Sequence, residues 1–101
     1  MTRVVISPLA KRDLTAIGDY IARDNPRAAR EFIRKMRSRC FLLRTAPWMG
    51  RTRDDFGEDI RSLTYGSYLI FYRYREDLDH VDILRFWHGR RLPPDVSELL
   101  D

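Results

Sequence analysis

The stretch Ile60–Arg91, IRSLTYGSYLIFYRYREDLDHVDILRFWHGRR, contains three segments with the composition of β-strands. Each segment is rich in β-branched and aromatic residues, which is typical of strands. The segments are Ile60–Tyr65, Tyr68–Arg75 and His80–His88. Only Gly66-Ser67 and Glu76–Asp79 separate them. Because strands joined by such short turns pair antiparallel, the stretch predicts a three-stranded antiparallel meander.

These strands contain the arginines Arg61, Arg73, Arg75 and Arg85, of which Arg61 and Arg85 lie in the interior of a strand. A buried charge is costly unless it is paired, so each arginine is expected either on an open sheet face or beside an acidic partner. Strict alternation along the last strand places four side chains on one face: Val81, Ile83, Arg85 and Trp87. An arginine beside an aromatic ring can receive an acidic chain or a nucleotide. The alternative is that Arg85 snorkels or pairs with an acidic neighbour, for which the candidates are Asp82, Glu58 and Asp59.

The N-terminal half predicts a short strand followed by two helices. Ser7-Pro8 and Asn25-Pro26 each combine a favourable N-cap with a proline at the first helical position. The predicted elements are a strand over Arg3–Ile6, a helix over Pro8–Arg23 and a second helix from Pro26 that stops at Ala46-Pro47. The two helices are joined by so short a turn that they form a hairpin.

The second helix has two faces of opposite character. Its apolar stripe recurs at steps of three and four residues: Ala29, Ile33, Met36, Cys40 and Leu43. Its basic stripe recurs in the same way on the other side: Arg27, Arg30, Arg34 and Arg37. The apolar stripe predicts packing on the sheet, and the basic stripe is then free to meet solvent or a partner.

Residues 1–101 therefore predict a single α+β domain with the order β-α-α-β-β-β. The helical hairpin is expected to cover one face of a small antiparallel sheet. The other face is expected to be open or half open, or to be covered by a partner or by the C-terminal tail. In that tail, Asp95 is placed to cap a helical turn that contains Val96, Leu99 and Leu100.

The charge of the chain comes almost entirely from arginine. Lys11 and Lys35 are the only lysines among 19 basic residues, so arginine supplies 17 of them, and the net charge is +4. A planar guanidinium binds carboxylates and phosphates in bidentate fashion. The composition therefore indicates a nucleic acid or an acidic protein segment as partner, with an arginine-rich soluble surface as the simpler alternative.

Several function classes are not supported by the sequence. Cys40 is the only cysteine, and His80 and His88 are eight residues apart without converging ligands, so we expect no disulfide and no metal site. There is no glycine-rich phosphate loop, and we expect no cofactor. No stretch has the length of a membrane span or of a signal peptide, which predicts a cytoplasmic protein.

Five motifs in order resemble the RelE/ParE superfamily of type II toxins, and most closely its ParE branch. They are SPLAKRDL at 7–14, IGDYIARDNPRAAREFI at 17–33, APWMGRTR at 46–53, IRSLTYGSYLIFYR at 60–73 and ILRFWHGRR at 83–91. The resemblance extends from Ser7 to Pro93. It implies the same β-α-α-β-β-β fold that the strand and helix patterns predict.

The resemblance implies a bacterial toxin that is neutralised by an acidic, partly disordered antitoxin of the ParD type, with a ribbon-helix-helix N-terminus, in a hetero-oligomer. ParE-like members are non-enzymatic poisons of DNA gyrase, which stall cleaved DNA and block replication and growth. The residues expected to bind partners are Arg30, Arg34, Arg37, Arg61, Arg85, Trp87, His88, Arg90 and Arg91.

The alternative is a RelE-like endoribonuclease that cuts mRNA on the ribosome. Arg61 and Arg85 match strand arginines that contact the scissile phosphate in that branch, and His88 lies near the position of a catalytic histidine. Two departures weaken this alternative. The lysines that the nuclease branch carries on its strands and loops are missing, and Gly89 stands where several nucleases carry a tyrosine. We therefore favour the ParE-like, non-enzymatic interpretation.

Overall fold

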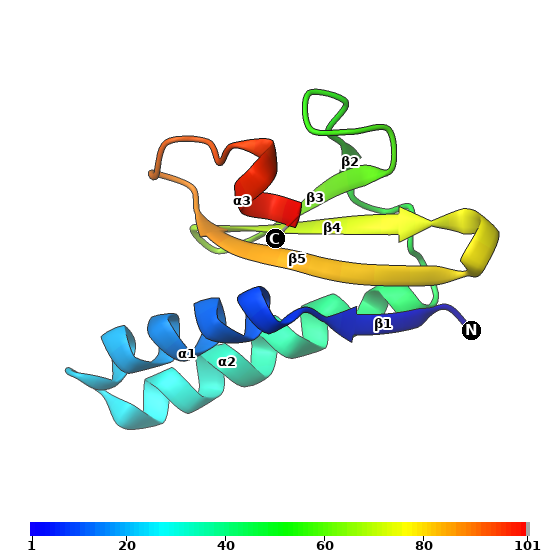
Figure 1. Ribbon diagram of the computed structural model, residues 1–101. Helices are drawn as coiled ribbons and strands as arrows, with labels where there is room; N and C mark the ends of the chain where they lie inside the picture. The colour runs from blue at the N-terminus through cyan, green and yellow to red at the C-terminus, as the bar shows by residue number, and fades with distance from the viewer. Residues whose placement is uncertain (101) are drawn as a thin grey trace.

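The computed structural model describes residues 1–100 and has three layers (Figure 1). A five-stranded sheet in the order β1-β5-β4-β3-β2 forms the middle layer. Helices α1 and α2 cover one face, and α3 lies on the other. The strands are β1 (Arg3–Ile6), β2 (Arg51–Thr52), β3 (Ile60–Tyr65), β4 (Tyr68–Arg75) and β5 (His80–His88). The helices are α1 (Pro8–Ala22), α2 (Pro26–Phe41) and α3 (Val96–Leu100), with 3₁₀ turns at Leu42–Arg44 and Glu76–Leu78.

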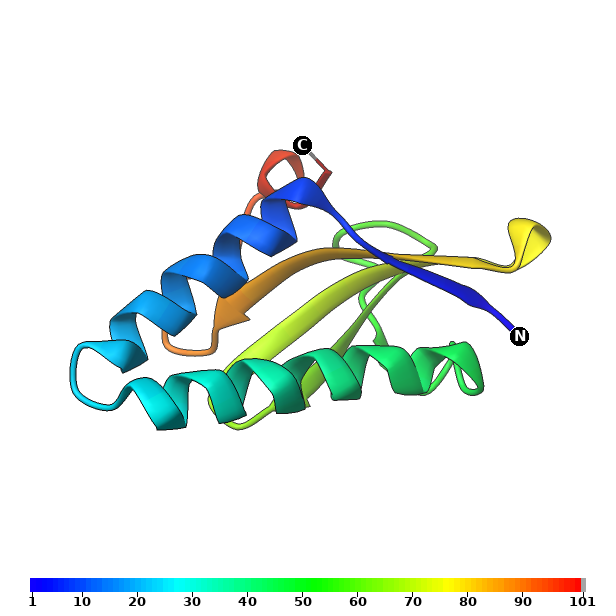
Figure 2. The same cartoon turned by 90° about the horizontal axis from the view of Figure 1, so that it is seen from below.

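Both long helices begin where the sequence predicts. The Ser7 hydroxyl accepts a hydrogen bond from the Ala10 N–H at 3.1 Å, and the Asn25 side chain accepts one from Ala28 at 3.0 Å. The predicted end of α2 at Ala46-Pro47 was too late. The helix ends at Phe41, and the chain tightens into a 3₁₀ turn before it reaches the proline. Seen from below, α1 and α2 meet at their connecting loop and splay apart across the sheet (Figure 2).

The sheet is mixed, so the expectation of an antiparallel sheet holds only for β2 to β5. Strand β1 pairs in parallel with β5, with Val4 opposite Val81 and Ile6 opposite Ile83. The helical hairpin carries the chain away from β1 before the meander begins, so no short turn forces an antiparallel pairing there. The two-residue strand β2, with Arg51 opposite Ser62, is an addition to the predicted order β-α-α-β-β-β.

A β-bulge changes the faces of β5. Phe71 of β4 lies opposite Arg85 and the adjacent Tyr72 lies opposite Ile83, so Leu84 is an extra residue in β5. The prediction that Ile83 and Arg85 share a face was therefore wrong. Ile83 faces the hairpin with Tyr72, whereas Arg85 faces the opposite side with Phe71.

Each face of the sheet carries its own hydrophobic cluster. The main core lies between the sheet and the hairpin and includes Leu14, Met36, Cys40, Ile70, Tyr72 and Phe86. A second cluster lies under α3 and consists of Ile60, Phe71, Leu84, Trp87 and Leu99. Of the alternatives that the sequence left open for the second face, the C-terminal tail covers part of it (Figure 1). Within residues 1–100, no helix is long and apolar enough to cross a membrane.

Candidate partner-binding site

Arg85 is held by α1. Its Nε and Nη2 atoms donate to the Asp13 carboxylate at 2.7 and 2.9 Å. Only 13% of the Arg85 side chain and 14% of the Asp13 side chain are exposed. The hydrogen bonds from Asp13 raise the pKa of Arg85, against the opposing effect of burial. The predicted partners Asp82, Glu58 and Asp59 were wrong, because the carboxylate that pairs with Arg85 belongs to Asp13 of α1.

Asp13 also completes the hydrogen bonding of β5. Its Oδ2 atom accepts from the Phe86 N–H at 3.0 Å. Strand β1 ends at Ile6, so the edge of β5 beyond Ile83 has no neighbouring strand, and α1 takes its place there. The Ser7 hydroxyl, which donates to the Leu84 carbonyl at 3.1 Å, makes the same kind of contact. An unpaired buried amide is costly, so these side chains stabilise the bulged end of β5.

Trp87 is 2% exposed and lies beside two arginines. Its indole N–H donates to the Leu92 carbonyl at 2.9 Å. The guanidinium carbons of Arg85 and Arg91 lie 5.1 and 3.7 Å from the centre of the indole. Such arginine–aromatic contacts leave the hydrogen-bond donors of an exposed guanidinium free. Arg91 is exposed and can meet a partner, whereas Trp87 itself is covered by the tail.

His88 lies at the end of β5 on the hairpin side of the sheet. It stands opposite Tyr68, whose ring meets the imidazole edge to face with centres 5.0 Å apart. The backbone N–H of Arg90 donates to its Nδ1 atom at 3.1 Å. A neutral imidazole that accepts at Nδ1 carries its proton on Nε2. His88, Tyr68 and Arg91 border a small hollow of about 220 Å³ beside Tyr20 of α1.

Arg61 holds the loop that follows α2. Its Nη1 atom donates to the carbonyls of Trp48 and Gly50, both at 2.9 Å. Tyr72 fixes the same loop from the core, since its hydroxyl donates to the Pro47 carbonyl and accepts from the Gly50 N–H, both at 2.8 Å. Arg61 is therefore already bound to backbone oxygens of the chain.

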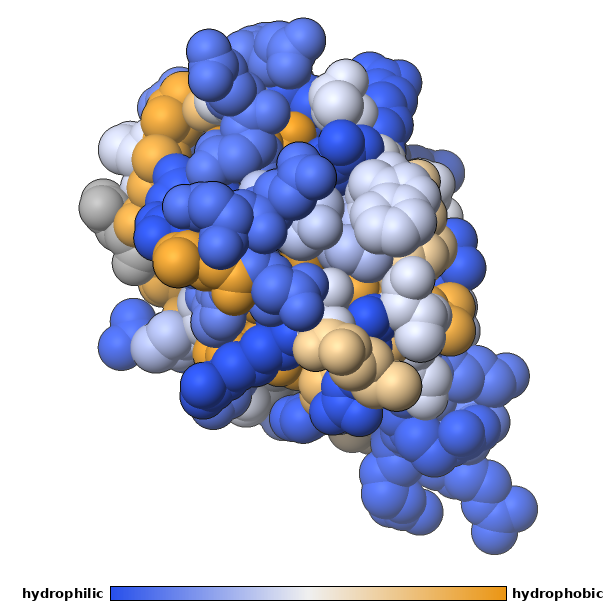
Figure 3. Space-filling view, turned by 90° about the vertical axis from the view of Figure 1, so that its right-hand side faces the viewer, coloured by the Kyte–Doolittle hydropathy of each residue, from blue (hydrophilic) through white to orange (hydrophobic). Residues whose placement is uncertain are grey.

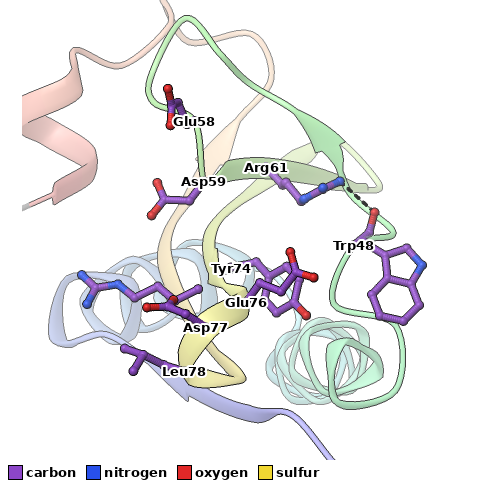
Figure 4. Close-up of a pocket in the computed structure, with 9 residues that line it drawn as sticks. Trp48, Glu58, Asp59, Arg61, Tyr74, Glu76, Asp77 and Leu78 are labelled. Atoms are coloured by element: carbon purple, nitrogen blue, oxygen red, sulfur yellow. Dashed lines mark hydrogen bonds between the residues drawn. The ribbon is translucent and has the colours of Figure 1, made fainter.

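Arg61 also borders a hollow of about 1000 Å³ at the start of β3 and the end of β4 (Figure 4). Beside Arg61 and Arg75, four carboxylates line it: Glu58, Asp59, Glu76 and Asp77. The indole of Trp48, 61% exposed, stands at its rim. A phosphate would meet these carboxylates, so the hollow is poorly suited to RNA.

The two arginines of the nuclease alternative lie on opposite faces of the sheet. Arg61 stands opposite Tyr72, which belongs to the main core under the hairpin. Arg85 stands opposite Phe71, which belongs to the second cluster under α3. Cross-strand partners point to the same face, so the sheet itself separates the two guanidinium groups.

His88 does not join either arginine. It shares the hairpin face with Arg61, but its cross-strand partner is Tyr68, four residues along β4 from the partner of Arg61. At a rise of about 3.4 Å per residue, the two are roughly 13 Å apart along the strands, and they lie on the two strands that flank β4. The three groups therefore do not surround one phosphate.

The arginines of α2 border an apolar groove on the outside of the hairpin. The groove has a volume of about 520 Å³, and Ala22, Pro26, Ala29 and Ile33 supply much of its lining. Arg30, Arg34 and Arg37 also line it and are exposed. Arg34 donates to Glu31 through Nη2 at 2.6 Å and through Nε at 3.2 Å, and this pairing lowers the pKa of Glu31. An apolar floor with basic walls fits an amphipathic acidic segment.

The end of the molecule that carries β1 and the β4–β5 turn is mainly hydrophilic (Figure 3). Apolar atoms are exposed there only in separate small areas. This end therefore offers polar and charged contacts more than a broad apolar interface.

Among residues 1–100, no group of three or more His, Cys, Asp or Glu side chains is placed to hold a metal ion.

Sequence reasoning missed the residues that position the site. Asp13 is one of several acidic residues on a helix, and nothing in its spacing distinguishes it from Asp19. Tyr72 is one of several tyrosines in its strand, and its spacing does not distinguish it from Tyr74. Leu99 was recognised as part of a capped turn, but not as a member of a core cluster. The available signal in the sequence was that both faces of the last strand mix polar and apolar residues. A β-bulge, which shifts the alternation by one residue, produces such a pattern.

A splayed helical hairpin on an antiparallel meander, with basic surfaces along α2 and at the end of β5, matches the fold of the RelE/ParE class of toxins. The family model described as the ParE toxin of the type II toxin–antitoxin system parDE matches residues 4–93. The chain belongs to this family. No match is found among curated proteins.

Two solved structures share the fold. One is described as the chromosomal ParDE toxin–antitoxin system from P. aeruginosa, with a TM-score of 0.72 and 22% sequence identity over 87% of this chain and 96% of that one. The other is the toxin–antitoxin complex RelBE2 from Mycobacterium tuberculosis, with a TM-score of 0.63 and 24% identity over 86% of this chain and 96% of that one. At these identities, the likeness establishes the fold.

Proposed function

We propose that this toxin is a non-enzymatic inhibitor of DNA gyrase that stalls cleaved DNA and thereby blocks replication and growth. Membership of the ParE family supports gyrase as the target. The observation that carries the non-enzymatic part is the separation of Arg61, Arg85 and His88 on the sheet. Acid–base catalysis requires its groups within hydrogen-bond reach of one reacting centre, roughly 3 Å.

The existing partners of the two arginines support the same proposal. Arg85 is paired with Asp13 on one side and donates through Nη1 to the Glu98 carbonyl on the other. Arg61 is bound to the carbonyls of the Trp48–Gly50 loop. Both guanidinium groups stabilise the fold, so both would have to break these bonds before they could bind a scissile phosphate.

The surface proposed for the target is the end of β5 and the turn after it. Arg90 and Arg91 are exposed there, and His88 lies beside the exposed ring of Tyr20. Positive charge and aromatic rings side by side suit the acidic surface of a DNA-handling protein. Trp87 contributes by holding Arg91 through its ring.

We propose that the antitoxin docks on the α1–α2 groove with an acidic segment that orders on binding. The apolar lining of the groove suits the apolar side chains of such a segment, and the arginines Arg30, Arg34 and Arg37 suit its acidic side chains. A ParD-like protein with a ribbon-helix-helix N-terminus is the expected partner, in a hetero-oligomer. The solved relatives, described as toxin–antitoxin systems, support a partner of this kind.

The test is expression of the toxin in bacteria without an antitoxin. The proposal predicts filamentous cells and DNA breaks that depend on gyrase, while bulk mRNA stays intact. Intact DNA together with widespread mRNA cleavage would reject it. Co-expression of an acidic protein encoded beside the toxin should restore growth, and a strain with a toxin-resistant gyrase should grow even without that protein.

A further inference from the structure

We propose that the second face of the sheet is a binding site for an acidic, leucine-bearing peptide, and that the C-terminal segment 92–100 of this chain occupies it as an exchangeable ligand. This segment lies almost wholly beyond residues 4–93, which match the ParE family. The proposal rests on contacts of the segment and not on the identity of the toxin's target. Its failure and the failure of the proposed function are therefore separate outcomes.

The site has the parts of a peptide-binding site. Leu99 is 1% exposed and inserts into the cluster formed by Ile60, Phe71, Leu84 and Trp87. Two side-chain donors of β5 bind backbone oxygens near the two ends of the segment. Arg85 Nη1 donates to the Glu98 carbonyl at 2.9 Å, and Trp87 Nε1 donates to the Leu92 carbonyl at 2.9 Å. Main-chain hydrogen bonds and one anchoring side chain are the usual means of peptide recognition.

The charge of the segment complements that of the protein. Residues 92–100 contain two acidic residues, Asp95 and Glu98, and no basic one, whereas residues 1–91 carry a net charge of +7. Glu98 lies close enough to Arg85 to contribute to its raised pKa. The segment therefore has the chemistry expected of an acidic partner: negative charge around a leucine on a helical turn.

The attachment of the segment is slight enough to be reversible. Pro94 and Leu99 are buried, but Leu92, Pro93, Asp95, Val96, Ser97 and Leu100 are exposed. Helix α3 has five residues, far fewer than an isolated helix needs, so docking alone keeps it helical. Short terminal segments with few buried contacts open locally without unfolding the domain.

The structure provides a reporter for opening. Of the two tryptophans, Trp87 lies under the segment and is 2% exposed, whereas Trp48 is 61% exposed. The variant Trp48→Phe leaves Trp87 as the only tryptophan. In this background, acrylamide quenching of fluorescence measures access of solvent to the site directly.

Leu99→Asp in the Trp48→Phe background should raise the quenching constant of Trp87 several-fold. The matched control is Leu100→Asp, which makes the same change at the exposed neighbouring residue and should leave quenching unchanged. Far-UV circular dichroism should show α1 and α2 intact in both. A Trp87 that stays shielded in Leu99→Asp would overturn the proposal, as would loss of the α1 and α2 signal in that variant.

The second measurement tests binding in trans. A tethered segment acts at an effective concentration of about millimolar, so the free peptide LPPDVSELL is added in that range to the full-length Leu99→Asp variant. It should shield Trp87 again in a saturable manner, and the peptide with Asp in place of the leucine of position 99 should not. If the first peptide also has no effect, the surface is not a binding site.

Hydrogen exchange of the unaltered chain provides a check that needs no substitution. The Glu98 N–H, which donates to the Asp95 carbonyl at 3.0 Å, should exchange at least a hundredfold faster than amides in the centre of β4. Equal protection of α3 and β4 would mean that the segment belongs to the cooperative core. That result would contradict exchangeable binding.

Discussion

The Arg85 guanidinium on β5 and the Asp13 carboxylate on α1 form a nearly buried, bidentate ion pair, with N–O distances of 2.7 and 2.9 Å. The pair joins the bulged end of β5 to α1, although the two residues are 72 positions apart in the chain. Arg85, which would contact the scissile phosphate in the nuclease alternative, is therefore already paired with a carboxylate. The pair is therefore a structural element of the fold, and its energetics can be measured without knowledge of the target.

Asp13→Ala should destabilise the domain by about 3 kcal/mol, because it leaves a buried guanidinium and the Phe86 amide without their partner. Urea unfolding followed by circular dichroism measures the change. The control is Asp19→Ala on the exposed side of α1, which should cost less than about 0.5 kcal/mol. Equal effects of the two substitutions would show that the pair is unimportant. Adding Arg85→Leu to Asp13→Ala should recover part of the loss, since no unpaired charge then remains.

Tyr72→Phe should cost about 1–3 kcal/mol, because the Gly50 N–H and the Pro47 carbonyl lose their buried partner. Tyr74→Phe is the matched control, since Tyr74 lies two residues further along the same strand and lines the open hollow at the end of β4. Gly50→Ala should be more harmful than Tyr72→Phe, because a Cβ atom there would lie 2.5 Å from the Tyr72 hydroxyl oxygen. A Tyr72→Phe variant as stable as Tyr74→Phe would contradict the assigned hydrogen bonds.

The Cys40 thiol should be inert in the folded protein. Burial raises its pKa from 9.0 to about 12, so almost no reactive thiolate is present at pH 8. A thiol reagent should react at least a hundredfold more slowly with the native chain than with the chain in urea. The sign of the pH effect follows. The unfolded thiol ionises above pH 9 and the folded one does not, so stability falls as the pH rises from 9 towards 12. Comparable rates in the native and unfolded states would place Cys40 outside the core.

Replacing Arg30 and Arg37 together by Glu should slow association with the antitoxin at least tenfold, because the groove on the hairpin loses the charges that attract an acidic segment. Stopped-flow association at low salt is the measurement. Arg12→Glu with Lys11→Glu makes the same change of charge on α1, away from the groove, and serves as control. An association rate that responds equally to both double variants would place the antitoxin elsewhere.

Local patterns in the sequence were sufficient for most of the fold. N-caps at Ser7 and Asn25 located both long helices, and the turn at Gly66, with a φ of +57°, joined β3 to β4 as predicted. These features depend on residues adjacent in the chain. The parallel pairing of β1 with β5 depends on how the hairpin returns to the sheet, and the N-terminal strand carries no sign of it.

The candidate site was less predictable for the same reason. Strict alternation fails at Leu84, where one inserted residue reverses the face of everything after it, including Arg85. The partner of Arg85 is 72 residues away and could not be identified by spacing. The stripe of Arg30, Arg34 and Arg37, which requires only helical periodicity, is exposed as the sequence predicted, whereas the groove beside it was not predicted.

The most direct test of the account uses two reactions with the purified toxin side by side. In the first, the toxin is mixed with gyrase, ATP and supercoiled plasmid, and the products are trapped with detergent and protease. In the second, it is mixed with ribosomes programmed with a defined mRNA. A gyrase poison should give linear plasmid that depends on gyrase, together with intact mRNA. Cleaved mRNA on the ribosome with no effect on gyrase, lost in both His88→Ala and Arg61→Ala, would contradict it.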